Sequence, residues 1–249
     1  MVGAQTKAEE WLPAVSAEGT PEAVTVSPNG AAAASAHTLA ADEKEEHARS
    51  LADDARTAAH LAEDMALRAA LSSAAAAVHA VRASGGVCLV TALGKSGSVA
   101  RRLAASLAST GMRAHFVHAA EWAHGDLGNL AGGPTALIAI SHSGKTAEVA
   151  GVAREASSRG LPVVAIVGGG AKAAAASPLG SVATQVVGYA LPGGVVEPFG
   201  GAPTASIVAQ EMAANALVRA LASRIGFDAR QFKVNHPGGA LGAALAGTN

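Results

Sequence analysis

Two short segments of this sequence combine glycine, hydroxyl and lysine side chains, a combination suited to binding phosphate. Residues 94–97 read GKSG and residues 141–146 read SHSGKT. Each segment follows an apolar run and precedes a helical pattern, so backbone N–H groups and a helix dipole would face a bound anion. The candidate ligand-binding residues of the two segments are Gly94, Lys95, Ser96, Ser141, His142, Ser143 and Thr146.

Each segment also has a simpler interpretation. The GKSG segment is not a nucleotide-binding P-loop, because that motif needs a glycine five residues before the one preceding the lysine, and Leu89 stands there. The segment still offers backbone donors and a positive charge, and in the simpler interpretation Lys95 is only a solvated lysine in a turn. Ser and Thr are favoured helix N-caps, so the hydroxyls of residues 141–146 could serve only to start a helix.

Few acidic side chains occur after residue 64, which makes each of them a candidate for acid–base chemistry. Glu148 follows the serine-rich segment and could act as a general base near a bound sugar phosphate, or only interact with a helix dipole. Glu197 lies in a loop segment and could equally be a solvated charge, and Asp126 could simply form a turn. His236 precedes a Pro-Gly-Gly sequence, and an isolated histidine is commonly structural.

Short apolar runs alternate with helical patterns after residue 86. This alternation predicts an α/β fold with a five-stranded parallel sheet flanked by helices, a three-layer arrangement like flavodoxin or Rossmann folds. In such sheets the ligand lies beyond the carboxyl ends of the strands, where both candidate segments fall. The predicted strands are residues 87–93, 113–118, 135–140, 161–167 and 184–191, and the predicted helices are 48–82 (one or two), 99–109, 147–158 and 205–225.

The charges divide the chain. Residues 1–64 hold 12 acidic and 4 basic side chains, whereas residues 65–249 hold 7 acidic and 14 basic ones. We expect residues 1–47 to be a disordered acidic tail and residues 48–249 to form the folded domain. The bases do not cluster and aromatic residues are few, so we expect a small anionic ligand and no nucleic acid. No apolar run is long enough to span a membrane, and one cysteine indicates a reducing compartment, so we expect a cytoplasmic protein.

Five longer segments follow one another along the chain: LGKSGSVARRLAASLASTG (93–111), FVHAAEWAHGDLG (116–128), ISHSGKTAE (140–148), PFGGAPTAS (198–206) and NHPGGALG (235–242). In this order they resemble the sugar isomerase (SIS) domain family, and within it the arabinose 5-phosphate isomerases. The likeness covers roughly residues 50–245. HGDLG and HPGGALG in particular distinguish this group from most other SIS proteins.

The resemblance implies interconversion of D-arabinose 5-phosphate and D-ribulose 5-phosphate, without a cofactor or metal. It also implies a homo-oligomer, typically a tetramer, whose active sites borrow residues from neighbouring subunits. By position, Lys95, Glu148 and His236 match residues regarded as catalytic in the family. The residues assigned to substrate binding by the same resemblance are Gly94, Ser96, His124, Ser141, His142, Ser143, Thr146 and Thr204.

This chain departs from the family pattern at several positions. His142 stands where the family commonly has Asn, and Lys145 where it commonly has Glu. A family glutamate is replaced by Val195, and we expect Glu197, directly before Pro198, to reach the same space as a catalytic residue. We expect no C-terminal pair of regulatory CBS modules, because the sequence ends soon after Gly242, and we expect any regulation to reside in the SIS domain.

The mechanism implied is an aldose–ketose isomerisation through an enediol. Glu148 would move the proton between carbons, Lys95 would stabilise the developing oxyanion, and His236 would assist ring opening or carry a proton between oxygens. Two alternatives remain at this point. The chain could bind a sugar phosphate as a non-catalytic sensor, or it could isomerise a different phosphosugar.

Overall fold

The computed structural model describes the backbone of residues 30–238 and the side chains from residue 42 onward. The α-helices are α1 (Gly30–Glu63), α2 (Met65–Ala83), α3 (Gly94–Ser109), α4 (Ala147–Ser158), α5 (Gly170–Ala176), α6 (Ala205–Arg224) and α7 (Ala229–Asn235). The strands are β1 (Val87–Ala92), β2 (Ala114–His118), β3 (Thr135–Ser141), β4 (Val163–Val167) and β5 (Gln185–Gly188). Three short 3-10 helices are η1 (Trp122–His124), η2 (Asp126–Leu130) and η3 (Gly180–Val182).

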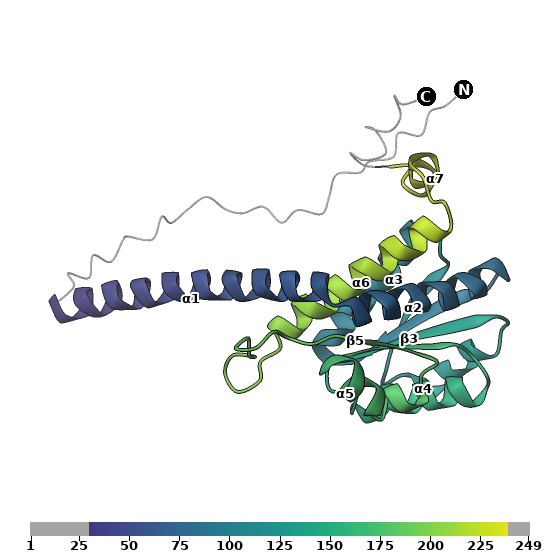
Figure 1. Cartoon of the computed structure of the whole chain (residues 1–249), viewed down its shortest axis with the longest axis horizontal. Coiled ribbons are helices and arrows are strands. Elements are labelled where there is room, and N and C mark those ends of the chain that lie inside the picture. Colours follow the sequence, from purple (N-terminus) through teal and green to yellow (C-terminus); the bar gives the residue numbers. More distant parts are fainter. Residues whose placement is uncertain (1–29, 239–249) are drawn as a thin grey trace, which may run out of the picture. The chain divides into compact units, whose positions relative to one another are not determined.

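The five strands form one sheet in the order β2-β1-β3-β4-β5, and all four neighbouring pairs are parallel. Helices α2, α3 and α6 cover one face of this sheet, and α4 and α5 cover the other (Figure 1). The predicted fold class, a five-stranded parallel sheet flanked by helices, is therefore confirmed. Parallel strands need long crossover connections, and helices supply them here.

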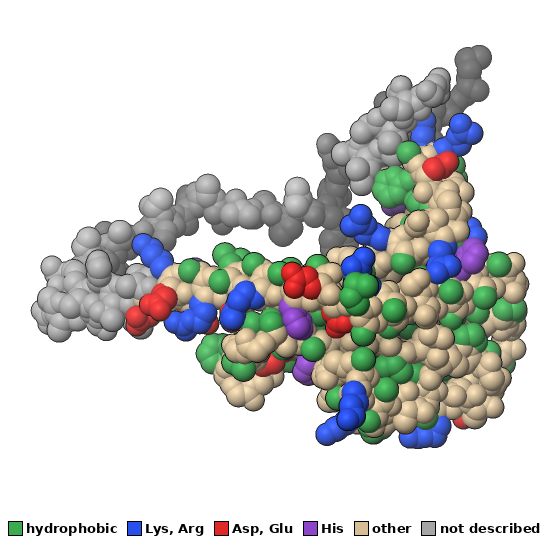
Figure 2. All heavy atoms as spheres, viewed as in Figure 1, with side chains coloured by type: hydrophobic (Ala, Val, Ile, Leu, Met, Phe, Trp, Pro, Cys, Tyr) green, Lys and Arg blue, Asp and Glu red, His purple; other side chains and the backbone are tan. Residues whose placement is uncertain are grey.

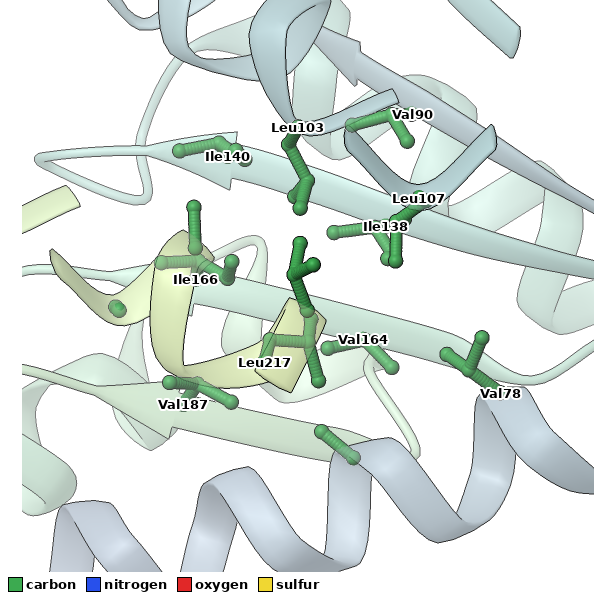
Figure 3. Close-up of a cluster of buried hydrophobic side chains, with 14 of the residues drawn as sticks. Val78, Val90, Leu103, Leu107, Ile138, Ile140, Val164, Ile166, Val187 and Leu217 are labelled. Carbon is green, nitrogen blue, oxygen red and sulfur yellow. The ribbon is translucent and has the colours of Figure 1, made fainter. Parts of the chain in front are cut away.

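Each face of the sheet has its own hydrophobic core, because successive side chains of a strand point to opposite faces. On β3, Ile138 and Ile140 pack with Leu103 and Leu217 from α3 and α6 (Figure 3). The alternate residues of the same strand, including Leu137, pack in the second cluster against α4. All seven residues of β3 are buried, which explains why the strands appear in the sequence as unbroken apolar runs.

The predicted helix at 147–158 has the same bounds as α4, but α3 begins five residues earlier than predicted, at Gly94. The GKSG segment is therefore the first turn of a helix and not a separate turn. Periodicity missed this start because a glycine-rich first turn carries no apolar side chain pattern. The sequence analysis also did not predict α5 or the 3-10 helices, which are too short to show a period.

Residues 30–47, which we expected to belong to a disordered tail, form the first part of α1 in the structure. This stretch is rich in alanine and also contains glutamate, residues with high helix propensity, so the helix forms despite the lack of an apolar stripe. Residues 1–29 lie outside the described part of the chain. Asp64 separates α1 from α2, where its carboxylate accepts a hydrogen bond from Leu67 N at 2.9 Å. The chain divides into two compact units between Glu46 and His47.

Basic side chains are dispersed over the second unit. On the face drawn in Figure 2, Lys and Arg side chains lie at several separate places over residues 47–238. Several arginines are already engaged within the fold: Arg102 forms an ion pair with Glu211, and Arg159 with Glu155 at 2.7 Å. Among residues 30–238, no helix combines the length and hydropathy needed to cross a bilayer.

Candidate active site

The candidate site lies where β1 and β3 end side by side. The chain leaves these neighbouring strands toward opposite faces of the sheet, into α3 and α4 respectively, which leaves a crevice between the two connections. A cavity of about 290 Å³ occupies this position. Its lining residues are Leu93, Lys95, Ser96, Ile140, Ser141, His142, Ser143, Thr146, Glu197, Gly201, Pro203, Ser206 and Ile207.

One wall of the cavity is the first turn of α3, which contributes Lys95 and Ser96. Gly94 is the first residue of this helix, and no side chain among the described residues caps it. The first N–H groups of a helix have no intrahelical acceptor, so this turn presents backbone donors together with the Lys95 ammonium group. The arrangement suits an anion or a developing oxyanion.

A second wall is the turn from β3 to α4, where hydroxyl groups are held by short local contacts. Ser141 Oγ lies 3.0 Å from Thr146 Oγ1 and accepts a hydrogen bond from Gly144 N at 3.2 Å. Ser143 Oγ accepts from Lys145 N at 3.1 Å. Thr146 occupies the N-cap position of α4, but its side chain makes no capping hydrogen bond. Its hydroxyl therefore faces Ser141 in the cavity wall and is not used to start the helix.

Gly144 makes the tight course of this turn possible. Its φ is +64°, a conformation that L side chains rarely adopt, and a Cβ atom there would lie 2.3 Å from Ser177 Oγ. Only glycine therefore permits the hydroxyls on either side of it to point into one cavity. Lys145, the next residue, is exposed and does not line the cavity.

Glu197 lies in the loop that precedes α6, and its side chain lines the cavity. Its carboxylate accepts hydrogen bonds from Thr204 N at 2.7 Å, Ala205 N at 3.0 Å, Ser206 N at 2.9 Å and Thr204 Oγ1 at 3.1 Å. Partial burial raises the pKa of Glu197, but these hydrogen bonds from Ser206 and Thr204 outweigh it and leave the pKa below its ordinary value. Glu197 is thus an ionised cap of α6 inside the cavity wall.

Val195, at the position where the resemblance implies a glutamate, is buried and does not line the cavity. Its apolar side chain cannot supply the charge that a glutamate would. Thr204, a candidate substrate-binding residue, also lies outside the lining, where its N–H and hydroxyl groups bind Glu197.

Glu148 and His124 are not brought into this cavity within one chain. Glu148 is exposed in the first turn of α4 and borders a separate hollow of about 270 Å³, together with Trp122 and Leu127. His124 is exposed at the end of η1. The HGDLG segment and Glu148 therefore border neighbouring surface on the α4 side of the sheet, away from the wall that holds Lys95.

His236 lies at the end of α7 and does not line the cavity either. Its ring stacks on Phe232 with centroids 3.9 Å apart, and its Nδ1 lies 2.8 Å from Phe232 O. The rest of the HPGGALG segment from residue 239 lies outside the described residues. One chain thus assembles the Lys95 wall, the serine turn (residues 141–146) and Glu197 around the cavity. The sequence-predicted candidates outside the lining are Gly94, His124, Glu148, Thr204 and His236.

Sequence reasoning missed two buried polar residues beside the cavity. The hydroxyl of Tyr189 lies 2.8 Å from His142 Nδ1, and Gln210 Nε2 donates to the same hydroxyl at 3.0 Å. A signal was available, because Tyr189 is the one tyrosine of the chain and lies in a predicted apolar strand. Among the described residues, no three His, Cys, Asp or Glu side chains gather in a way that would hold a metal ion.

Comparisons with known proteins find relatives in sequence and in fold. The chain is 38% identical over 160 residues to the arabinose 5-phosphate isomerase KdsD of Salmonella typhi, covering 64% of this chain and 47% of that protein. The chain spans about half the length of the curated relatives it matches. A solved structure from E. coli CFT073, the protein c3406 in complex with arabinose 5-phosphate, is 26% identical with a TM-score of 0.67 and covers 79% of this chain and 98% of that one.

A more distant structure shares the fold alone. The Vibrio vulnificus NanR protein, complexed with ManNAc-6P, is 22% identical with a TM-score of 0.59, covering 80% of this chain and 69% of that one. The SIS domain family matches residues 87–220, which is more than half of the chain and contains β1 to β5. With its parallel sheet and its cavity at the ends of β1 and β3, the protein belongs to the SIS domain family.

Proposed function

We propose that this protein is an aldose–ketose isomerase that interconverts D-arabinose 5-phosphate and D-ribulose 5-phosphate. The observation that carries the proposal is the convergence of Lys95 with Ser141, Ser143 and Thr146 on one cavity, in a chain 38% identical to an arabinose 5-phosphate isomerase. The hydroxyls and the helix N-termini would bind the phosphate, and this contact would place C1 and C2 of the open-chain sugar at a constant distance from it.

The reaction needs a proton to leave C2 of the aldose and to be delivered to C1 after the carbonyl has moved. The intermediate is an enediol, and negative charge develops on the oxygen of C1 as the proton leaves C2. Lys95 lines the cavity and would stabilise this charge as a cation. The chemistry requires neither a metal ion nor a redox cofactor, because one carboxylate can move the proton between adjacent carbons.

Glu148 remains our candidate for that carboxylate. Glu197 is the carboxylate within the cavity of a single chain, but four hydrogen bonds stabilise its ionised form and lower its pKa, which weakens it as a base. Glu148, His124 and His236 lie outside the cavity of their own chain. We therefore propose that a second copy of the chain brings such residues to the cavity, as in the oligomers of the family it resembles.

The test is an assay of the purified full-length chain with arabinose 5-phosphate, following ribulose 5-phosphate by NMR. We expect turnover in both directions, and a loss of about 10²- to 10⁴-fold in Glu148→Gln, the range for removal of a general base. Glu63→Gln, which removes an exposed carboxylate at the end of α1, is the matched control and should retain wild-type turnover.

The assay is combined with light scattering, because a site completed by a second copy requires an oligomer. A monomer with full activity would contradict the shared site. A mixture of Glu148→Gln and Lys95→Met chains supplies a sharper test, since mixed oligomers regain some intact sites if the two residues come from different copies. No recovery of activity on mixing would place both residues in the same copy.

A sensor that binds sugar phosphate without turning it over is the second candidate. The observation that favours it is Val195, which is buried and apolar where the family has a glutamate. The discriminating experiment is calorimetry with a panel of pentose, hexose and heptose phosphates, each also tested for isomerisation. Tight binding without turnover of any of them, unchanged in Glu148→Gln, would establish the sensor, and turnover of another sugar would identify a different SIS isomerase.

A further inference from the structure

Three polar side chains form a continuous hydrogen-bonded chain that ends in the cavity. Gln210 Nε2 donates to the Tyr189 hydroxyl at 3.0 Å, and that hydroxyl lies 2.8 Å from His142 Nδ1. Tyr189 and Gln210 are fully buried, at 0% exposure, whereas His142 lines the cavity and is exposed to it. The three residues come from the position after β3, the position after β5, and α6, so tertiary packing alone brings them together.

The direction of these hydrogen bonds follows from the donors available. Gln210 Nε2 faces the Tyr189 hydroxyl and donates to it, and Gln210 Oε1, on the other side of the amide, has no partner among the described residues. The Tyr189 oxygen therefore accepts from Gln210. Its own proton then has one acceptor within reach among the described residues, which is His142 Nδ1.

Tyr189 stays protonated, so this direction persists. Burial, with a smaller contribution from the charge of Glu197, raises the pKa of Tyr189 above its ordinary value. A phenol that donates to Nδ1 selects the imidazole tautomer with its proton on Nε2. The ring is held closely as well, because a Cβ atom at residue 168 would lie 2.5 Å from His142 Nδ1, and only glycine leaves room for the ring there.

We propose that His142 binds the sugar part of the substrate, donating its Nε2–H to a hydroxyl or carbonyl oxygen, with Tyr189 and Gln210 as the residues that position it. The proposal rests on the proposed function, since it takes the cavity to hold a sugar phosphate. Lys95 and the serine turn supply cationic and hydroxyl donors for the phosphate, whereas a neutral imidazole suits an uncharged oxygen. Glu197, in the same lining, can accept from a second sugar hydroxyl but cannot donate.

The first test concerns the tautomer and needs no turnover. In ¹⁵N-histidine-labelled full-length protein, His142 should show a protonated Nε2 and an unprotonated, hydrogen-bonded Nδ1 at neutral pH. Tyr189→Phe removes the donor, so the His142 signals should move toward those of exchanging tautomers. A protonated Nδ1 in the wild type, or identical His142 signals in Tyr189→Phe, would overturn the proposal. A thermal melt of the variant checks that it is folded.

The second test separates recognition of the sugar from recognition of the phosphate. By calorimetry, His142→Phe should weaken binding of arabinose 5-phosphate about 10-fold, the loss of one good hydrogen bond, and leave binding of inorganic phosphate unchanged. His115→Phe, an exposed histidine on β2 outside the cavity, is the matched control and should alter neither affinity. Equal weakening of both ligands, or of neither, would overturn the proposal.

The results of these two tests on His142 can be told apart from a failure of the isomerase proposal. If the wild type binds arabinose 5-phosphate without isomerising it, the isomerase proposal fails, and the contrast between sugar phosphate and inorganic phosphate still decides the role of His142. If the protein isomerises the sugar, Tyr189→Phe should lower kcat/KM with its melting temperature retained, and Tyr189→Phe combined with His142→Phe should cost no more than His142→Phe alone. Additive losses would contradict a positioning role for Tyr189.

Discussion

The N-termini of α4 and α6 face the same cavity from different walls, and they are used differently. At the start of α4, Thr146 makes no capping hydrogen bond and the nearby hydroxyls of Ser141 and Ser143 lie in the cavity wall. At the start of α6, the carboxylate of Glu197 accepts three backbone N–H groups and one hydroxyl. The chain thus occupies the N-terminus of α6 with its own carboxylate and leaves the N-terminus of α4 without one.

This difference indicates where a phosphate can bind. A dianion placed at the start of α6 would have to displace Glu197 or lie beside a like charge, both of which are unfavourable. The start of α4 offers hydroxyls and helix N–H groups without a competing carboxylate, and the start of α3 adds Lys95. We therefore expect the phosphate on the α3–α4 side of the cavity and the sugar hydroxyls toward Glu197.

Among changes to the two sides of the cavity, the largest effect is expected from Lys95→Met, which removes the cation of the α3–α4 side. Loss of a preorganised group that stabilises a developing charge costs about 10²- to 10³-fold in kcat. We expect a decrease of that size in arabinose 5-phosphate isomerisation, with an unchanged circular dichroism spectrum. Lys172→Met, at an exposed position of α5, is the control. A Lys95→Met decrease of less than tenfold would mean that the α3 wall does not take part in the chemistry.

Gly144→Ala should disrupt the serine turn through its backbone. The positive φ and the close approach to Ser177 Oγ are both incompatible with a Cβ atom, and we expect a loss of about 2 kcal/mol of stability in urea unfolding. Gly151→Ala in the interior of α4 is the matched control, because a Cβ there meets nothing within 4 Å. That control should gain about 0.5–1 kcal/mol, since alanine is the better helix former. Equal effects at both positions would remove the argument for a strained turn.

Ser143→Ala should weaken anion binding on the α4 side without altering the fold. Its hydroxyl accepts from Lys145 N and lines the cavity, so its removal takes away one donor to a charged ligand. We expect the Kd for inorganic phosphate to rise about 10-fold, the lower range for a hydrogen bond to a charged group. Ser158→Ala, exposed at the other end of α4, controls for general effects on this helix. An unchanged Kd would move the phosphate to another wall.

Glu197→Gln tests the α6 side of the cavity, where we expect the change in the free energy of unfolding. Because the folded-state pKa of Glu197 lies below its ordinary value of 4.5, the carboxylate stabilises the fold fully above the unfolded-state pKa. That stabilisation is lost as the pH falls through the folded-state pKa. We expect Glu197→Gln to cost about 1 kcal/mol at pH 7, as for loss of a charged helix cap.

The measurement for Glu197 is urea unfolding of wild type and variant at pH 7 and at pH 3. The difference between them should shrink at the lower pH. A difference that is independent of pH would mean that the capping contacts do not depend on the ionised carboxylate. A gain in phosphate affinity in Glu197→Gln would further show that the α6 end becomes available to an anion once its own carboxylate is neutral.

The strands and the position of the two candidate phosphate-binding segments were predictable from local patterns. Unbroken apolar runs such as residues 135–140 mark strands buried on both faces, and glycine and hydroxyl residues directly after them mark carboxyl ends of strands. The helix α1 was not predicted over residues 30–47, because alanine-rich helices need no apolar stripe. The contacts of Glu197 were not predictable, since they join a loop to a helix start seven to nine residues away.

By itself, the sequence determined an α/β chain with hydroxyl, glycine and lysine residues at two strand ends, because strand burial and turn chemistry are local properties. The order of its five motifs carried the resemblance to SIS domains. Only the tertiary structure decided which candidates share a cavity. It placed Lys95, the serine turn and Glu197 together, left Glu148, His124 and His236 outside, and joined His142 to Tyr189 and Gln210. Those outcomes depend on the order of strands in the sheet and on helix packing, which bring together residues far apart in the chain.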